Sequence, residues 1–245
     1  MRPAFNISEI TSKKSAIRRW LHNTTLIFIL FLSLNAYSQI NYQGFADKSV
    51  YFGISLAYNS SDFKYTPSNE FLNDDSVLVI ESSKGPGFNL GIISNFRMGE
   101  YFDLRFIPAL VFGEKQLNYE LSSDSFHNQT IESIYLDFPI ALRFKSQPIK
   151  DMKIYVTGGF KYAYDLASNS TARKAEDLVK VFRHDIDIEY GLGFQFFFPL
   201  FILSPEIKFS HGLFNIHSRD PNLIYSRVID KLLSRTITIS IHIEG

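Results

Sequence analysis

Charged side chains recur at every second position inside segments that are otherwise rich in Phe, Tyr, Ile and Leu. Successive residues of a β-strand point to opposite faces, so these charges share one face and the bulky apolar residues occupy the other. The six acids and five bases nearly cancel, and buried ions of opposite sign are expected to pair, so we expect a structural network. This predicted interior network comprises Asp103, Arg105, Asp137, Arg143, Lys145, Lys161, Asp165, Asp187, Glu189, Glu206 and Lys208.

Few other residues could carry chemistry. The chain has no cysteine, which excludes thiolate metal sites, Fe–S clusters and cysteine nucleophiles. The histidines show no ligand spacing such as H-E-x-x-H, so we expect no metal, no cofactor and no enzymatic activity. The formal net charge is zero, and this balance gives no support for nucleic-acid binding.

The N-terminal region has the three parts of a secretory signal peptide. Basic residues at positions 13, 14, 18 and 19 precede an apolar run over 26–34. Ala36-Tyr37-Ser38 then follows as a small-x-small cleavage site. This run of nine residues is too short for a helix to span about 30 Å of hydrocarbon. We therefore expect residues 1–38 to be cleaved and residues 39–49 to remain as a short periplasmic tail.

Eight segments alternate apolar with small or polar residues, and most have nine or more residues. Strands of globular proteins usually have about five or six. Short connections alternate with long ones between these segments, which is typical of the periplasmic turns and external loops of outer-membrane barrels. The segments are 50–59, 88–96, 102–113, 134–145, 154–165, 186–198, 201–210 and 237–244. The short connections are 98–101, 146–151 and 199–200, and the long ones are 60–86, 121–132, 166–184 and 214–234.

The sequence therefore predicts an all-β fold. Residues 50–245 are expected to form an eight-stranded antiparallel up-and-down transmembrane β-barrel in the outer membrane, with short periplasmic turns and four longer external loops. A soluble lipocalin-like barrel has the same period but an apolar interior. The bulky side chains argue against it, because an eight-stranded barrel is only just wide enough for side chains inside. The face rich in small residues must point inward, and the bulky face must meet lipid. Pro108, Pro139 and Pro205 lie within strand patterns and predict bulges or broken pairing.

Apolar residues recur at helical spacing in the 214–234 connection, where a polar loop would be expected. Ile224, Val228 and Leu232 follow one another at intervals of four, which predicts a short amphipathic helix. Such a helix could dock a partner protein, or it could pack as a lid on the mouth of the barrel. The sequence leaves both alternatives open.

Several short blocks follow one another along the predicted barrel. They are IESIYLDFP at 131–139, Gly158-Gly159 with Tyr162, Asp165-Leu166-Ala167-Ser168, SPEIK at 204–208, Tyr225-Ser226 and Leu233-Ser234-Arg235. Together these blocks resemble the PorT family, over most of the chain from about residue 51 to residue 243. PorT proteins are small outer-membrane barrels of Bacteroidota that are required for the type IX (Por) secretion system and, in gliding species, for motility.

The resemblance implies a non-enzymatic assembly or accessory component of type IX secretion. Its partners would be outer-membrane lipid and other components of that system. Three other classes stay open. An OmpX-like structural or adhesion barrel would differ only in its partners. A lipid-modifying barrel enzyme would need a His and a Ser facing each other across strands near the outer leaflet, and a soluble carrier would not need detergent for extraction.

Overall fold

The computed structural model describes residues 44–45, 48–69, 71, 77–121, 126–167, 181–219, 226 and 228–245. All of them belong to one compact unit, Ile40–Gly245. The predicted signal peptide lies outside the described residues, as does most of the predicted periplasmic tail. No helix in the described part of the chain is long and apolar enough to cross a membrane.

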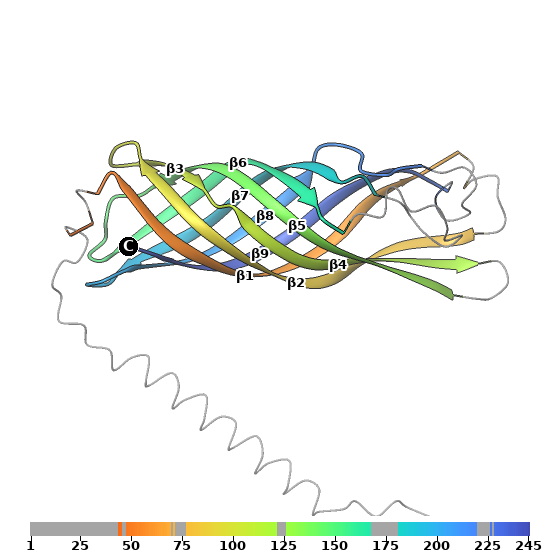
Figure 1. Cartoon of the computed structure of the whole chain (residues 1–245), viewed down its shortest axis with the longest axis horizontal. Helices are drawn as coiled ribbons and strands as arrows, with labels where there is room; N and C mark the ends of the chain where they lie inside the picture. The colour runs from red at the N-terminus through yellow and green to blue at the C-terminus, as the bar shows by residue number, and fades with distance from the viewer. Residues whose placement is uncertain are drawn as a thin grey trace, which may run out of the picture. The chain divides into compact units, whose positions relative to one another are not determined.

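Nearly all described residues lie in β-strands, and each strand pairs antiparallel with its neighbours (Figure 1). β1 pairs with both β2 and β9, which closes the sheet into a ring. β3 and β4 follow one another between β2 and β5, so together they count as one interrupted strand of the barrel. The ring therefore has eight strands. The predicted eight-stranded barrel is confirmed. The strands are β1 (Val50–Pro67), β2 (Val77–Arg97), β3 (Phe102–Phe106), β4 (Ala109–Leu121), β5 (Phe126–Lys145), β6 (Met152–Asp165), β7 (His184–Phe197), β8 (Ile202–Gly212) and β9 (Ile229–Glu244).

Proline interrupts the strand ladders, as predicted. The gap between β3 and β4 contains Ile107 and Pro108, and the register on either side places Ile107 opposite Pro139 of β5. Pro205 lies in a gap of the β7–β8 ladder, although it pairs with Ile241 of β9. The cause is the missing N–H of proline, which cannot donate a hydrogen bond to the neighbouring strand.

The hairpins are longer than the sequence patterns predict. β1 continues to Pro67 and β2 begins at Val77, so most of the predicted 60–86 loop is strand. β5 and β9 extend in the same way into the predicted loops 121–132 and 214–234. Outside a membrane a strand no longer needs a continuous apolar face, so the alternation that marks the strands weakens there. The fourth predicted loop, between β6 and β7, keeps its length.

Side-chain exposure confirms which face of each strand points outward. Phe52, Ile92 and Phe160 are 59%, 62% and 59% exposed on the outside of the ring. Tyr51 and Ser55, at alternate positions of β1, are buried inside it. The small and charged residues therefore fill the lumen, and the bulky residues form a continuous apolar outer face.

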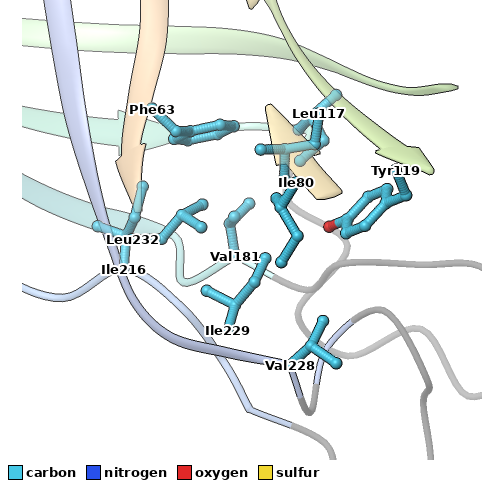
Figure 2. Packing of buried hydrophobic residues seen from close by; sticks show 10 residues of the cluster. Phe63, Ile80, Leu117, Tyr119, Val181, Ile216, Val228, Ile229 and Leu232 are labelled. Carbon is cyan, nitrogen blue, oxygen red and sulfur yellow. The ribbon is translucent and has the colours of Figure 1, made fainter. Parts of the chain in front are cut away.

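A hydrophobic cluster lies at the end of the strands opposite the short turns, and Figure 2 shows how its side chains pack together. We call it the outer cap; it consists of Phe63, Ile80, Leu117, Tyr119, Ile131, Val181, Ile216, Val228, Ile229 and Leu232. Strands and connections both contribute to the cap. β1, β2, β4, β5 and β9 continue into it, and Val181, Ile216 and Val228 come from the connections. The cap is thus a small apolar core that is separate from the charged lumen.

The predicted amphipathic helix does not extend to the end of the 214–234 connection, although Ser226 is helical. β9 begins at Ile229, so Leu232 lies in a strand, while Ile224 lies outside the described residues. Val228 and Leu232 are both 0% exposed in the outer cap, which agrees with the lid alternative. Residues four apart also share one face of a strand, so the spacing alone did not separate the two structures.

A residue on the N-terminal side of β1 packs at the other end of the ring. Phe45 packs with Tyr51, Phe197 and Ile202 in a second buried cluster. The backbone oxygen of Phe45 accepts a hydrogen bond of 2.7 Å from Arg97 Nη1. Part of the predicted 39–49 tail therefore packs against the barrel.

Candidate functional site

The residues of the predicted interior network lie inside the ring. Ten of them are at most 9% exposed, and the side chain of the remaining one, Lys208, is 16% exposed. They divide into a turn-side cluster near the short turns and a cap-side cluster near the outer cap. The turn-side cluster includes Asp103, Arg105, Arg143, Lys145 and Glu206. The cap-side cluster includes Asp137, Lys161, Asp187, Glu189 and Lys208.

Two arginines are the centre of the turn-side cluster. Arg105 Nη1 lies 3.3 Å from Glu206 Oε2, and Arg105 Nη2 lies 2.8 Å from Glu244 Oε1. Arg143 Nη2 lies 2.6 Å from Asp103 Oδ2. The side chains of these residues are at most 3% exposed, so each ion depends on its partner and not on water for its stabilisation.

Tyrosine side chains complete the turn-side cluster. Tyr51 donates a hydrogen bond of 3.0 Å to Asp103 Oδ2, and Tyr155 donates one of 2.9 Å to Glu206 Oε2. The guanidinium of Arg143 lies 4.9 Å from the centroid of the Tyr155 ring, a distance suited to a cation–π contact. The carboxylates thus accept hydrogen bonds from neutral as well as charged donors.

The cap-side cluster is organised around one lysine. Lys161 Nζ lies 2.7 Å from Asp187 Oδ2, 3.3 Å from Asp137 Oδ2 and 3.8 Å from Glu189 Oε1. Lys208 Nζ lies 3.0 Å from the other carboxylate oxygen of Glu189. Three carboxylates therefore share two ammonium groups, and the predicted pairing of acids with bases is observed.

Two predicted members lie at the margins of the clusters. Lys145 pairs with Asp103 at the turn side. Asp165 accepts a hydrogen bond of 2.9 Å from the backbone N–H of Ala167. Its observed role is to hold the turn that follows β6.

Sequence reasoning missed several interior residues. They occupy inward positions of the strand alternation, but they are either uncharged or lie outside or at the end of the predicted segments. The period-two pattern could have found Tyr51, Tyr155 and Glu244, had uncharged and terminal positions been considered with the others. The buried residues that were missed include Tyr51, Asn95, Lys115, Tyr155, Asp185, His242 and Glu244.

A small cavity with both polar and apolar lining residues adjoins the cap-side cluster. Its volume is about 70 Å³, and its lining includes Asn59, Asp137, Lys161, Asp187 and Lys208. About two water molecules fit in this space at about 30 Å³ each. Within the described ranges, no three His, Asp or Glu side chains are grouped as ligands of a metal ion. The lumen is thus a filled ionic network with a small internal void.

The sequence also matches a known family. Residues 37–218, which are more than half of the chain, match the family described as outer membrane protein beta-barrel domain. The chain belongs to this family. Its ring is therefore an outer-membrane β-barrel, with lipid against the bulky apolar face. Short turns face the periplasm in such barrels, so the turn-side cluster lies at the periplasmic end and the outer cap at the external end.

Three solved structures are similar to this outer-membrane barrel at low sequence identity. OprG from Pseudomonas aeruginosa is 12% identical, with 80% of this chain and 92% of that chain covered and a TM-score of 0.46. Ail of Yersinia pestis, in complex with the heparin analogue sucrose octasulfate, is 15% identical over 81% and 100% of the two chains, with a TM-score of 0.37. Neisserial surface protein A is 11% identical over 78% and 95%, with a TM-score of 0.38. No curated protein sequence matches the chain.

A Ser–His hydrogen bond lies beside the outer cap of the barrel. His217 Nε2 and Ser226 Oγ are 3.0 Å apart, and the two residues are 4% and 0% exposed. Burial, together with the nearby charge of Arg219, lowers the pKa of His217 from its usual value. A lipid-modifying enzyme would need such a pair open to the outer leaflet, whereas this pair is enclosed by protein.

The filled lumen predicts that the outer-membrane barrel conducts no ions. The two ionic clusters occupy an interior that, at eight strands, is only just wide enough for side chains. We expect recordings of the purified protein in planar bilayers to show no stable single-channel current. Heat-modifiable gel mobility of the same preparation is the control for folding, and large stable currents from a folded sample would contradict the prediction.

Proposed function

We propose that this outer-membrane barrel supports type IX protein secretion, and gliding motility where present, as a non-enzymatic assembly or accessory component. The observation that carries the proposal is where the PorT-like blocks fall in the fold. Asp137 of the first block, and Glu206 with Lys208 of the SPEIK block, point into the lumen and belong to the ionic network. The resemblance therefore includes interior residues that set this barrel apart, and not only the apolar outer face that any small barrel has.

An accessory role fits the filled lumen better than a role as conduit. The turn-side cluster closes the ring with desolvated ion pairs, and the remaining void of about 70 Å³ has no room for a polypeptide. Secreted protein would have to cross the membrane elsewhere. The barrel would then act through the surfaces that it presents to other components of the system.

The outer cap is the part of the barrel best suited to present such a surface. It is a packed core outside the membrane, so it can hold the surrounding strands and connections in a fixed arrangement. Val228 and Leu232, two of the residues predicted to dock a partner, are buried within it. In this proposal the packing of these two residues fixes the shape of the docking surface, and exposed residues around them contact the partner protein.

A complementation experiment tests the proposed function. In a strain that lacks the barrel, the wild-type gene should restore secretion of type IX cargo. Leu232→Ala should restore it poorly, because truncating a fully buried Leu costs about 2–5 kcal/mol of packing and would loosen the outer cap. Cargo in the medium is the measurement, and heat-modifiable mobility of the barrel shows that the protein is folded in the membrane.

Ile241→Ala is the matched control, since Ile241 lies on the lipid face of the same strand and is 51% exposed. It should restore secretion fully. Normal secretion in the strain that lacks the barrel would refute the proposed function. In that event an OmpX-like structural or adhesion role, which the family match equally allows, would become the leading hypothesis, and co-purification would show no type IX components.

A further inference from the structure

Four polar side chains form a row across neighbouring strands on the outside of the barrel. Asp62 of β1 is paired in register with Arg235 of β9, and Arg235 is paired with His211 of β8. Ser61 and Gly85 form the outermost pair of the β1–β2 ladder, so the next residues outward are Asp62 and Lys84. The row therefore runs from Lys84 through Asp62 and Arg235 to His211. We call it the rim row.

The rim row marks the external edge of the apolar face. One step toward the membrane centre on β8 and β9 are Phe209 and Ile237, which begin the lipid-facing residues of those strands. The row lies on the side of the barrel away from the short periplasmic turns. It is thus placed at the depth where the headgroups of outer-leaflet lipids meet the barrel.

A groove of about 260 Å³ runs along the rim row. Its lining includes all four side chains of the row together with Phe209 and Ile237. The groove thus has a polar wall and an apolar wall. This is the arrangement that a lipid needs, with its headgroup on the charged side and its acyl chains on the other.

Two cations and one carboxylate give the rim row a net positive charge. Asp62 accepts hydrogen bonds of 3.0 Å from Arg235 Nε and 2.9 Å from Arg235 Nη2. This bidentate pair fixes the guanidinium and leaves its Nη1 group outside the pair. Lys84 is exposed, and among the described residues its ammonium has no hydrogen-bond or ion-pair partner. An oriented guanidinium and an unpaired ammonium are both good donors to a phosphate group.

We propose that the rim row binds a phosphate of an outer-leaflet lipid headgroup. Lys84 supplies the free charge, and Arg235, held in place by Asp62, supplies directed N–H donors. His211 borders the site and is held by the Tyr190 hydroxyl, which lies 3.0 Å from its Nε2. Phe209 and Ile237 contact the acyl chains below the headgroup. This lipid site is independent of the proposed role in secretion.

Titration of the purified barrel in detergent with lipid A, read by native mass spectrometry, tests the proposal. A basic residue near a lipid headgroup contributes about 1 kcal/mol, which corresponds to a fivefold change in affinity. Lys84→Gln should therefore weaken binding of bisphosphorylated lipid A about fivefold, and Lys84→Gln/Arg235→Gln should weaken it further. Lys150→Gln, an exposed lysine of a periplasmic turn, is the matched control and should leave binding unchanged.

The ligand is varied to identify what the site recognises. Dephosphorylated lipid A should bind the wild type and Lys84→Gln equally weakly. Binding that ignores the phosphate groups, or an equal loss in Lys84→Gln and Lys150→Gln, would overturn the proposal. Inorganic phosphate should compete only weakly, and competition as strong as that of lipid A would overturn the assignment to a lipid.

A second variant keeps the test separate from folding. Asp62→Asn removes the negative charge from the rim row but can still accept a hydrogen bond from Arg235. It should bind bisphosphorylated lipid A at least as tightly as the wild type does. A loss as large as that of Lys84→Gln would mean that removing a negative charge weakens binding of the phosphate, which contradicts recognition by the net positive charge of the row and would refute the proposal.

Discussion

Replacing Arg105 by Met is expected to lower the free energy of unfolding of the barrel by about 3–5 kcal/mol. The guanidinium neutralises Glu206 and Glu244, which are both buried in the turn-side cluster. Methionine fills a similar volume, but it leaves two carboxylates without that charge in a lumen from which bulk water is excluded. Urea unfolding of the protein in lipid vesicles, followed by heat-modifiable gel mobility, measures the change.

Two further variants show whether charge is the cause. Adding Glu206→Gln to Arg105→Met should recover part of the stability, because the amide is neutral and can still accept the hydrogen bond from Tyr155. Arg235→Gln removes a guanidinium whose side chain is 44% exposed in its pair with Asp62. Exposed pairs contribute about 0–1 kcal/mol. Equal destabilisation by Arg105→Met and Arg235→Gln would contradict a desolvated ionic core.

Replacing Ile140 by Arg is expected to reduce insertion of the barrel by about 2–4 kcal/mol. Ile140 is 55% exposed on the outer face of β5, midway between the short turn and the external rim. A guanidinium at this depth loses its hydration and finds no partner in the hydrocarbon. The fraction of protein that folds into vesicles as a function of urea concentration gives the cost.

Leu200→Arg is the matched control for Ile140→Arg, because Leu200 lies at a periplasmic turn and is 86% exposed. Near the interface the same substitution should cost only about 0–1 kcal/mol. If both variants inserted equally well, the outer face of β5 would not be in contact with lipid and the facing of the strands would have to be revised.

The facing of the strands follows from the sequence alone. Side chains of a strand alternate with a period of two, and a narrow barrel has no room for the bulky set inside. Phe160 outside and Lys161 inside could therefore be assigned without coordinates. The broken pairing at Pro108 and Pro205 could also be predicted, because it depends only on the missing N–H of proline.

The extent of the hairpins and the outer cap could not be predicted in this way. Outside the membrane, the burial of a side chain depends on which connections fold over which strands. The alternation of apolar and polar residues therefore no longer indicates which side chains are buried. Leu232 illustrates the difficulty, since its spacing from Val228 suits a helix and a strand equally. Its place in β9 follows from pairing with Tyr65 of β1, which is distant in the sequence.

The sequence by itself determined that the interior is charged, balanced and enclosed by an apolar face, because these properties depend on residue type and strand period. Only the tertiary structure decided which charges meet. Arg105 pairs with Glu206 and Glu244, which are 101 and 139 residues away, and the rim row joins four strands through three separate registers. Closure of the ring sets those registers, and no local pattern in the chain encodes them.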